Sequence, residues 1–143
     1  MDRLLTCSRW EQRGRGALVT GIDQVLEAAR SRLDRLEPAQ AYAEQQRGAL
    51  LVDTRSAAQR ADDGEVPGAV VVERTVLEWR FDPVCPFKLT EATGYDLRVI
   101  VLCAHGFSSS LAAASLQDMG LSRATDVIGG FEAWNAAGLP TTT

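Results

Sequence analysis

The sequence predicts an α/β fold, an open and mostly parallel sheet of about four to five strands with helices on both faces. Two observations predict it. Short runs of four apolar residues alternate along the chain with segments of helical periodicity, the order typical of a parallel sheet. These runs are apolar at every position, as in strands that are covered on both sides. The 143 residues, 45% of them hydrophobic, suffice for one such domain and its core.

The amino-terminal part of the chain divides into two segments. Residues 1–19 show no clear period, and we expect them to be loosely ordered. Residues 20–36 predict an amphipathic helix packed on the domain and capped by Thr20, because apolar residues recur on one helical face: Ile22, Val25, Leu26, Ala29, Leu33 and Leu36. We interpret this stripe as packing; if exposed, it would instead offer a surface to a partner. The domain itself is expected over residues 37–140, with a polar tail at 141–143.

The first half of the domain contains two predicted strands. Pro38 suits the first turn of a helix that ends near Gln46. The apolar runs 49–52 and 69–72 then predict the first and second strands. Residues 73–97 are irregular and contain prolines, so we expect a long surface excursion there.

The second half repeats the alternation of strand and helix. The run 99–102 predicts the third strand, and a short loop at 103–108 leads into a helix over 109–119. A last short strand is expected at 126–128, and a closing helix over 131–137 follows a glycine turn.

Composition and charge exclude several classes of function. The formal net charge is −4, and the basic residues are scattered, so the basic stripe of a nucleic-acid-binding protein is not expected. No apolar run approaches the roughly 20 residues of a membrane span, and the first residues lack a signal-peptide core. Three cysteines are too few for a disulfide scaffold, which favours a reducing, cytoplasmic location. The oligomeric state stays open.

Cys103 stands where the third predicted strand ends, and ligands of open parallel sheets bind at such ends. Gly106 lets the backbone approach a ligand closely, and the serines that follow can cap the next helix. Backbone N–H groups would then point at the Cys103 sulfur and favour a thiolate, or an anion bonded to it. Attack on sulfur or phosphorus is the chemistry this favours. The residues alone leave open that Cys103 is a small apolar residue at a strand end.

Four separated motifs tip the balance towards a reactive cysteine. They are LVDTR at 51–55, GEVPGA at 64–69, VLC with its loop at 101–108, and GGFEAW at 129–134 followed by GLP at 138–140. In this order they resemble the single-domain rhodanese-like sulfurtransferase family. The resemblance implies a rhodanese-like fold with a loop of six residues counted from its cysteine, which this chain fits.

The resemblance implies that Cys103 is the catalytic nucleophile. It would take a sulfane sulfur from thiosulfate or a persulfide and pass it to a thiol, a protein or another nucleophilic acceptor. Substrate would bind in the loop, at Ala104, His105, Gly106, Phe107, Ser108 and Ser109. Asp53 and Arg55 would support the loop through ion pairs and hydrogen bonds. No cofactor is implied, and no metal site is expected because Cys7 and Cys85 have no paired spacing.

The loop departs from the family at one point that carries charge. Phe107 and Ser108 stand where many members have a cation, which predicts that thiosulfate is a poor donor. Trp79 and Arg80 could form a substrate wall, with Arg80 supplying the missing charge. A noncatalytic rhodanese-like regulatory or sulfur-carrier module is therefore the alternative. A cysteine phosphatase is a distant third, because no arginine occurs between Cys103 and Asp118 to hold phosphate.

Three further residues have both a reactive and a structural interpretation, and we favour the structural one. His105 could donate to an acceptor or tune the thiolate, but we expect it to line the loop mouth facing water. Cys85 could resolve a persulfide on Cys103 by thiol exchange, but we expect it to be unreactive. Trp134 is expected to pack in the core or at its edge.

Overall fold

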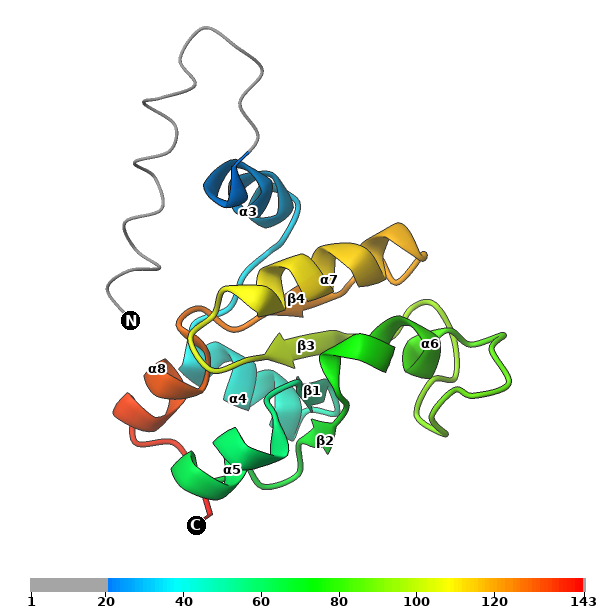
Figure 1. Ribbon diagram of the computed structural model, residues 1–143. Coiled ribbons are helices and arrows are strands. Elements are labelled where there is room, and N and C mark those ends of the chain that lie inside the picture. The colour runs from blue at the N-terminus through cyan, green and yellow to red at the C-terminus, as the bar shows by residue number, and fades with distance from the viewer. Residues whose placement is uncertain (1–20, 143) are drawn as a thin grey trace, which may run out of the picture.

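The computed structural model describes residues 21–142, which are built around a four-stranded parallel sheet (Figure 1). The strands, in the spatial order β2-β1-β3-β4, are β1 (Leu50–Asp53), β2 (Val70–Val71), β3 (Val99–Leu102) and β4 (Thr125–Asp126). All three pairings are parallel, and β1 lies beside β3 along its whole length. The predicted open parallel sheet is confirmed, with four strands in the described part of the chain.

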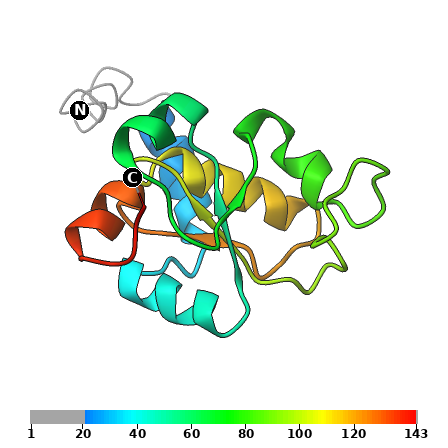
Figure 2. The ribbon, with the colours of Figure 1, turned by 90° about the horizontal axis from the view of Figure 1, so that it is seen from below.

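Helices cover both faces of the sheet (Figures 1 and 2). One face carries α3 (Ile22–Ser31), α6 (Leu77–Phe81) and α7 (Ser108–Asp118), and the other carries α4 (Pro38–Gln46) and α8 (Gly130–Ala136). The predicted placement of helices on both faces is therefore confirmed, and the helices at 38–46 and after the 103–108 loop begin within one residue of their predicted positions.

Each face of the sheet has its own core, because successive strand residues point to opposite sides. In β3, Val99 and Val101 pack with α6 and α7, whereas Ile100 and Leu102 pack with α4 and α8. All four side chains are fully buried. This two-sided burial fixes β3, and with it the start of the loop that follows, in the middle of the domain.

The first helix is shorter than the sequence predicts. It ends at Ser31 rather than at residue 36, and Leu36 pairs with Val127 in a parallel bridge beside β4. The Leu36 N–H donates to the Asp126 carbonyl at 3.1 Å, and its own carbonyl accepts from Ile128 at 2.9 Å. An extended Leu36 thus satisfies its backbone groups and buries its side chain against the sheet, which a continued helix would not do.

The apolar stripe of that helix is only partly buried. Leu26 and Ala29 are buried where α3 packs on α7, whereas Ile22 and Val25 are exposed. The expected cap, Thr20, lies outside the described residues together with everything before it.

Two helical segments were not predicted from the sequence. Residues 73–97, expected to be irregular surface, contain a 3-10 turn at Arg74–Val76 and α6, whose Leu77 and Phe81 are fully buried in the core. The other is α5 (Ala57–Asp63), which follows β1. Helices of five and seven residues span too few turns for an apolar period to stand out in the sequence.

The expected carboxyl-terminal tail is attached to the domain. Thr142 pairs with Glu65 in an antiparallel bridge, with hydrogen bonds of 2.7 and 2.8 Å in the two directions. This bridge holds the end of the chain beside the segment between α5 and β2.

Candidate active site

Cys103 is the first residue after β3, in the loop that leads into α7 (Figure 1). Because β3 lies between β1 and β4, this loop is at the carboxyl edge of the sheet and near its middle. Ligand sites of open parallel sheets lie at such an edge. Cys103 is 6% exposed, so the loop shields most of the residue from water while its sulfur borders a cavity.

Two backbone amides of the loop donate to the Cys103 sulfur. The Gly106 nitrogen lies 3.1 Å and the Ser109 nitrogen 3.4 Å from Sγ. Ser109 belongs to the first turn of α7, so the partially positive end of that helix faces the sulfur. The predicted convergence of loop amides on Cys103 is confirmed, and this arrangement stabilises negative charge on the sulfur or on an atom bonded to it.

The glycine pair of the GGFEAW motif allows the loop to pack closely. Gly106 has a φ of +82°, and a Cβ built there would lie 2.6 Å from the Gly129 nitrogen. Gly130, with a φ of +62°, faces the other side of the same contact. The first turn of α8 then donates to the carbonyls of Cys103 and Ala104 at 2.7 and 3.1 Å. The motif therefore holds the loop through its backbone.

Asp53 and Arg55 form a buried ion pair at the carboxyl end of β1. Arg55 Nη2 lies 2.7 Å from Asp53 Oδ2, and both side chains are 1% exposed. The guanidinium also donates to the Gly64 carbonyl at 2.9 Å and lies over the Phe131 ring, 3.9 Å from its centre. The pair thus connects the end of β1, the end of α5 and the start of α8.

The loop opens onto two neighbouring cavities. The one that Cys103 lines measures about 250 Å³, and Thr54, Arg55 and Gln59 line it as well. The second measures about 410 Å³ and shares Ala104 and His105 with the first. A small donor and a larger acceptor could therefore approach the sulfur from adjoining spaces.

Carboxylates dominate the polar lining of the larger cavity. Asp62, Asp63 and Glu132 all line it, and each is exposed. His105 is at the boundary of the two cavities with 32% of its side chain exposed, and its Nδ1 lies 3.7 Å from Glu132 Oε2. His105 thus lines the loop mouth and is partly exposed to water, as expected.

The structure does not bring Trp79, Arg80 or Cys85 to this site. α6 and the segment after it lie beyond the amino end of β3, at the opposite end of the sheet from the loop (Figure 1). Arg80 donates to the Phe87 carbonyl, and Trp79 is 59% exposed. The idea of a substrate wall carrying the missing charge is therefore not supported by their placement. Trp134 is fully buried, as expected.

Sequence reasoning missed two arginines that bind the back of the loop. Arg30, near the end of α3, and Arg35 donate to the Gly106 carbonyl at 2.7 and 3.1 Å. Arg35 also pairs with Asp126 of β4, at 2.8 Å. Their sequence signal is weak, because arginines on a surface helix are common; the one local signal is the acidic Asp126 at the start of the predicted strand 126–128, which needs a partner if it is buried.

The charges around the loop act on the pKa of Arg30. Burial lowers this pKa below its ordinary value, and the neighbouring Arg35 lowers it further. Asp126 and Cys103 act in the opposite direction, because negative charge on either one favours the guanidinium cation. Arg30 is thus electrostatically linked to the sulfur.

Residues 21–142 contain neither a metal-binding cluster nor a membrane-spanning helix. The side chains of His, Cys, Asp and Glu in this part of the chain form no group of three that could hold a metal ion. No helix in the same range is long and apolar enough to cross a membrane.

Comparison with known proteins gives a family and several relatives. The family model described as "Rhodanese-like domain" matches residues 37–137. Thiosulfate sulfurtransferase GlpE of Pseudomonas savastanoi pv. phaseolicola is 36% identical over 102 residues, which cover 71% of this chain and 87% of that protein. Thiosulfate sulfurtransferase GlpE of Haemophilus influenzae (strain PittEE) is 31% identical over 105 residues, or 73% and 90% of the two chains.

Solved structures are similar over the same region. A protein from Rhodopseudomonas palustris CGA009, described as of unknown function and a possible tyrosine phosphatase, superposes with a TM-score of 0.78 at 34% identity; the match covers 87% of this chain and 96% of that one. A rhodanese-related protein from Thermoplasma volcanium gives a TM-score of 0.59 at 23% identity, covering 76% and 96% of the two chains, and so shares the fold.

Proposed function

This chain belongs to the rhodanese-like domain family, and from that membership we propose that it is a sulfurtransferase that carries sulfur on Cys103. The donor is a sulfane-sulfur compound, thiosulfate or a persulfide, and the acceptor is a thiol or another nucleophile. The names of the GlpE relatives support the reaction class. The pair of amides 3.1 and 3.4 Å from the Cys103 sulfur is the single observation that carries the role of this residue.

The proposed reaction has two half-reactions that meet at one covalent intermediate. The Cys103 thiolate attacks the outer sulfur of the donor, the donor S–S bond breaks, and sulfite leaves from thiosulfate or a thiolate leaves from a persulfide. The Gly106 and Ser109 N–H groups then stabilise the negative charge of the Cys103 persulfide, as hydrogen bonds from water would do in solution. An acceptor thiolate then attacks that outer sulfur, and the Cys103 thiolate is released.

The charge of the cavities bears on the choice of donor. The cavity beside the sulfur contains Arg55, whose charge is neutralised by Asp53, and three carboxylates line the adjoining cavity. These carboxylates repel thiosulfate, which carries two negative charges, more strongly than a singly charged persulfide. We therefore expect a low-molecular-weight persulfide to load Cys103 faster than thiosulfate does.

Intact-protein mass spectrometry after incubation with each donor tests the proposal. We expect the mass of the protein to rise by one sulfur atom, and the gain to disappear when a thiol acceptor is added. Cys85→Ser is the matched control, because Cys85 belongs to the segment that follows α6, at the other end of the sheet, and this variant should load normally. Cys103→Ser should not load. If wild type gains no sulfur from any donor, the proposal is wrong.

The similarity to a structure described as a possible tyrosine phosphatase makes phosphate ester hydrolysis the second candidate. A cysteine phosphatase needs a guanidinium that holds the equatorial phosphate oxygens from within reach of the loop. Residues 103–118 contain no arginine, and Arg30 and Arg35 bind the loop on its Gly106 carbonyl. We therefore expect p-nitrophenyl phosphate hydrolysis to be no faster with wild type than with Cys103→Ser.

A further inference from the structure

We propose that Arg30 and Arg35 are positioning residues for Cys103, and that Arg30 supplies from outside the rhodanese-like region the positive charge that the loop lacks. The family match begins at residue 37, so both arginines precede it. The inference rests on the proposed role of Cys103 as the sulfur-accepting nucleophile.

Gly106 connects the arginines to the sulfur. Its N–H donates to Cys103 Sγ at 3.1 Å, and its carbonyl accepts from Arg30 at 2.7 Å and from Arg35 at 3.1 Å. A glycine with a positive φ has wide conformational freedom. The two arginines fix the peptide group that follows Gly106, which limits the rotations about the Gly106 backbone bonds that would turn its N–H away from the sulfur.

The second amide is held by the same network. Ser109 donates its N–H to the sulfur and its hydroxyl to Asp126, at 3.4 and 2.7 Å. Ser110 also donates to Asp126, at 2.7 Å, and accepts from Arg30 Nε at 3.1 Å. Asp126 is fully buried, and its carboxylate oxygens accept from Ser109, Ser110 and Arg35.

The cluster carries an excess of positive charge. Two guanidinium groups face one carboxylate, which leaves about one unit of positive charge behind the loop. Arg35 pairs with Asp126, whereas Arg30 has no carboxylate partner among the described residues and lies over the Phe107 ring, 5.6 Å from its centre. Arg30 therefore acts on an anion at the sulfur through a partly buried environment, where charges are screened less than in water.

The apolar contact between α3 and α7 keeps Arg30 beside the loop, whereas Arg32 makes an exposed ion pair, with side chains 42% and 66% exposed. Arg32, two residues on, pairs with Asp118 at the far end of α7 at 2.6 Å and donates to the Ala114 carbonyl at 3.3 Å. Leu26 and Ala29 are buried at the α3–α7 contact. Arg32 makes polar contacts with α7 but none with the loop, which makes it the matched control for Arg30.

The test compares two alkylating reagents of different charge on Cys103. In a background with Cys7→Ser and Cys85→Ser, rate constants are measured at one pH for neutral iodoacetamide and anionic iodoacetate. We expect Arg30→Met to lower the iodoacetate-to-iodoacetamide ratio about fivefold, as loss of one nearby charge would do. Arg30→Lys should restore most of the ratio, and Arg32→Met should leave it near the value of the parent protein.

Equal ratios for Arg30→Met, Arg32→Met and the parent would overturn the proposal. Thermal unfolding of each variant shows whether it is folded; if Arg30→Met is not, Arg30→Gln replaces it, since Gln keeps an amide donor without the charge. Alkylation of the free thiol needs no sulfur donor, so the ratio tests the effect of Arg30 whether or not Cys103 can accept sulfur. If wild type is never persulfidated, the proposed function fails while the charge effect stands or falls separately.

Discussion

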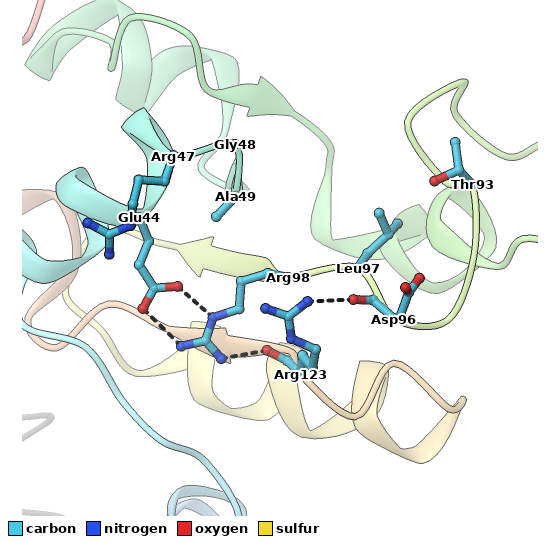
Figure 3. A pocket seen from close by; sticks show the side chains of 9 residues that line it. All are labelled: Glu44, Arg47, Gly48, Ala49, Thr93, Asp96, Leu97, Arg98 and Arg123. Atoms are coloured by element: carbon cyan, nitrogen blue, oxygen red, sulfur yellow. Dashed lines mark hydrogen bonds and ion pairs between the residues drawn. The ribbon is translucent and has the colours of Figure 1, made fainter.

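The two ends of the parallel sheet both carry arginine–carboxylate pairs, but these pairs bind different parts of the structure. At the amino end, Arg98 holds Glu44 through hydrogen bonds of 2.8 and 3.1 Å and donates to the Arg123 carbonyl at 2.8 Å. These groups line an open cavity of about 550 Å³. Figure 3 shows them, with Arg123 bonded to the Asp96 carbonyl. Each guanidinium there joins the segments that enter the strands.

At the carboxyl end, the pairs are more buried and lie around a reactive group. Arg55 and Asp53 are 1% exposed, and Asp126 is fully buried with Arg35 at 16%. Arg35 also donates to the carbonyl of Gly106, and the N–H of the same glycine donates to the Cys103 sulfur. The same residue types therefore stabilise strand entry at one end and the geometry of a nucleophile at the other.

The difference shows that the role of an arginine follows from the groups that its guanidinium contacts. At the amino end the cavity is larger, yet Arg98 and Arg123 are bonded to Glu44 and to backbone carbonyls, and no cysteine lies among its lining residues. At the carboxyl end smaller cavities border a cysteine held by two amides. Three comparisons of variants at the two ends can break or sharpen this contrast.

The largest effect is expected for Arg55→Met. Removing this guanidinium leaves Asp53 buried without its ion-pair partner, which costs about 3–5 kcal/mol in the free energy of unfolding. The same substitution at the amino end, Arg98→Met, breaks a pair whose side chains are about a fifth exposed and should cost about 1 kcal/mol or less. Urea unfolding of both variants measures the two losses. Losses of equal size would remove the distinction between the two ends.

A smaller effect is expected for Ser109→Ala. This change removes one donor to buried Asp126, which keeps its bonds to Ser110 and Arg35, so about 1–2 kcal/mol of stability should be lost. Ser108→Ala is the control: Ser108 is exposed in the same helical turn, and its variant should stay within about 0.5 kcal/mol of wild type. Chemical denaturation gives both values. A Ser109→Ala protein as stable as Ser108→Ala would mean that the Asp126 cluster does not hold the loop tightly.

The carboxyl end was easier to predict from the sequence than its supports. The run 99–102 is continuously apolar because β3 is buried on both sides, and Cys103 follows it at once, so strand and nucleophile could be located together. Asp53 and Arg55 lie two residues apart at a strand end and so could be paired. These features involve residues that are close in sequence, so the sequence alone could indicate them.

Long-range contacts could not be predicted in the same way. Arg30 reaches Gly106 from 76 residues away, and nothing in its neighbourhood distinguishes it from Arg32, which binds Asp118 instead. Leu36 had a helical spacing but gains more from pairing with Val127 at the sheet edge, because that pairing satisfies its backbone. Tertiary contacts decided both cases.

The smallest effect is expected for Glu44→Gln, and its pH dependence is the sharpest property of the amino end. The hydrogen bond from Arg98 is the main cause that holds the pKa of Glu44 below its ordinary value of 4.5. A carboxyl whose pKa is depressed by folding stabilises the protein fully above its unfolded pKa and loses this contribution as pH falls through the folded pKa. Wild type should therefore exceed Glu44→Gln by about 0.5–1 kcal/mol near pH 7, since the pair is partly exposed. Below the ordinary pKa the difference should shrink, and urea unfolding of both proteins from neutral to acid pH measures it. If the difference in the free energy of unfolding stays constant with pH, the effect comes from packing of the Glu44 side chain. The charge of the Glu44–Arg98 pair would then contribute nothing to stability.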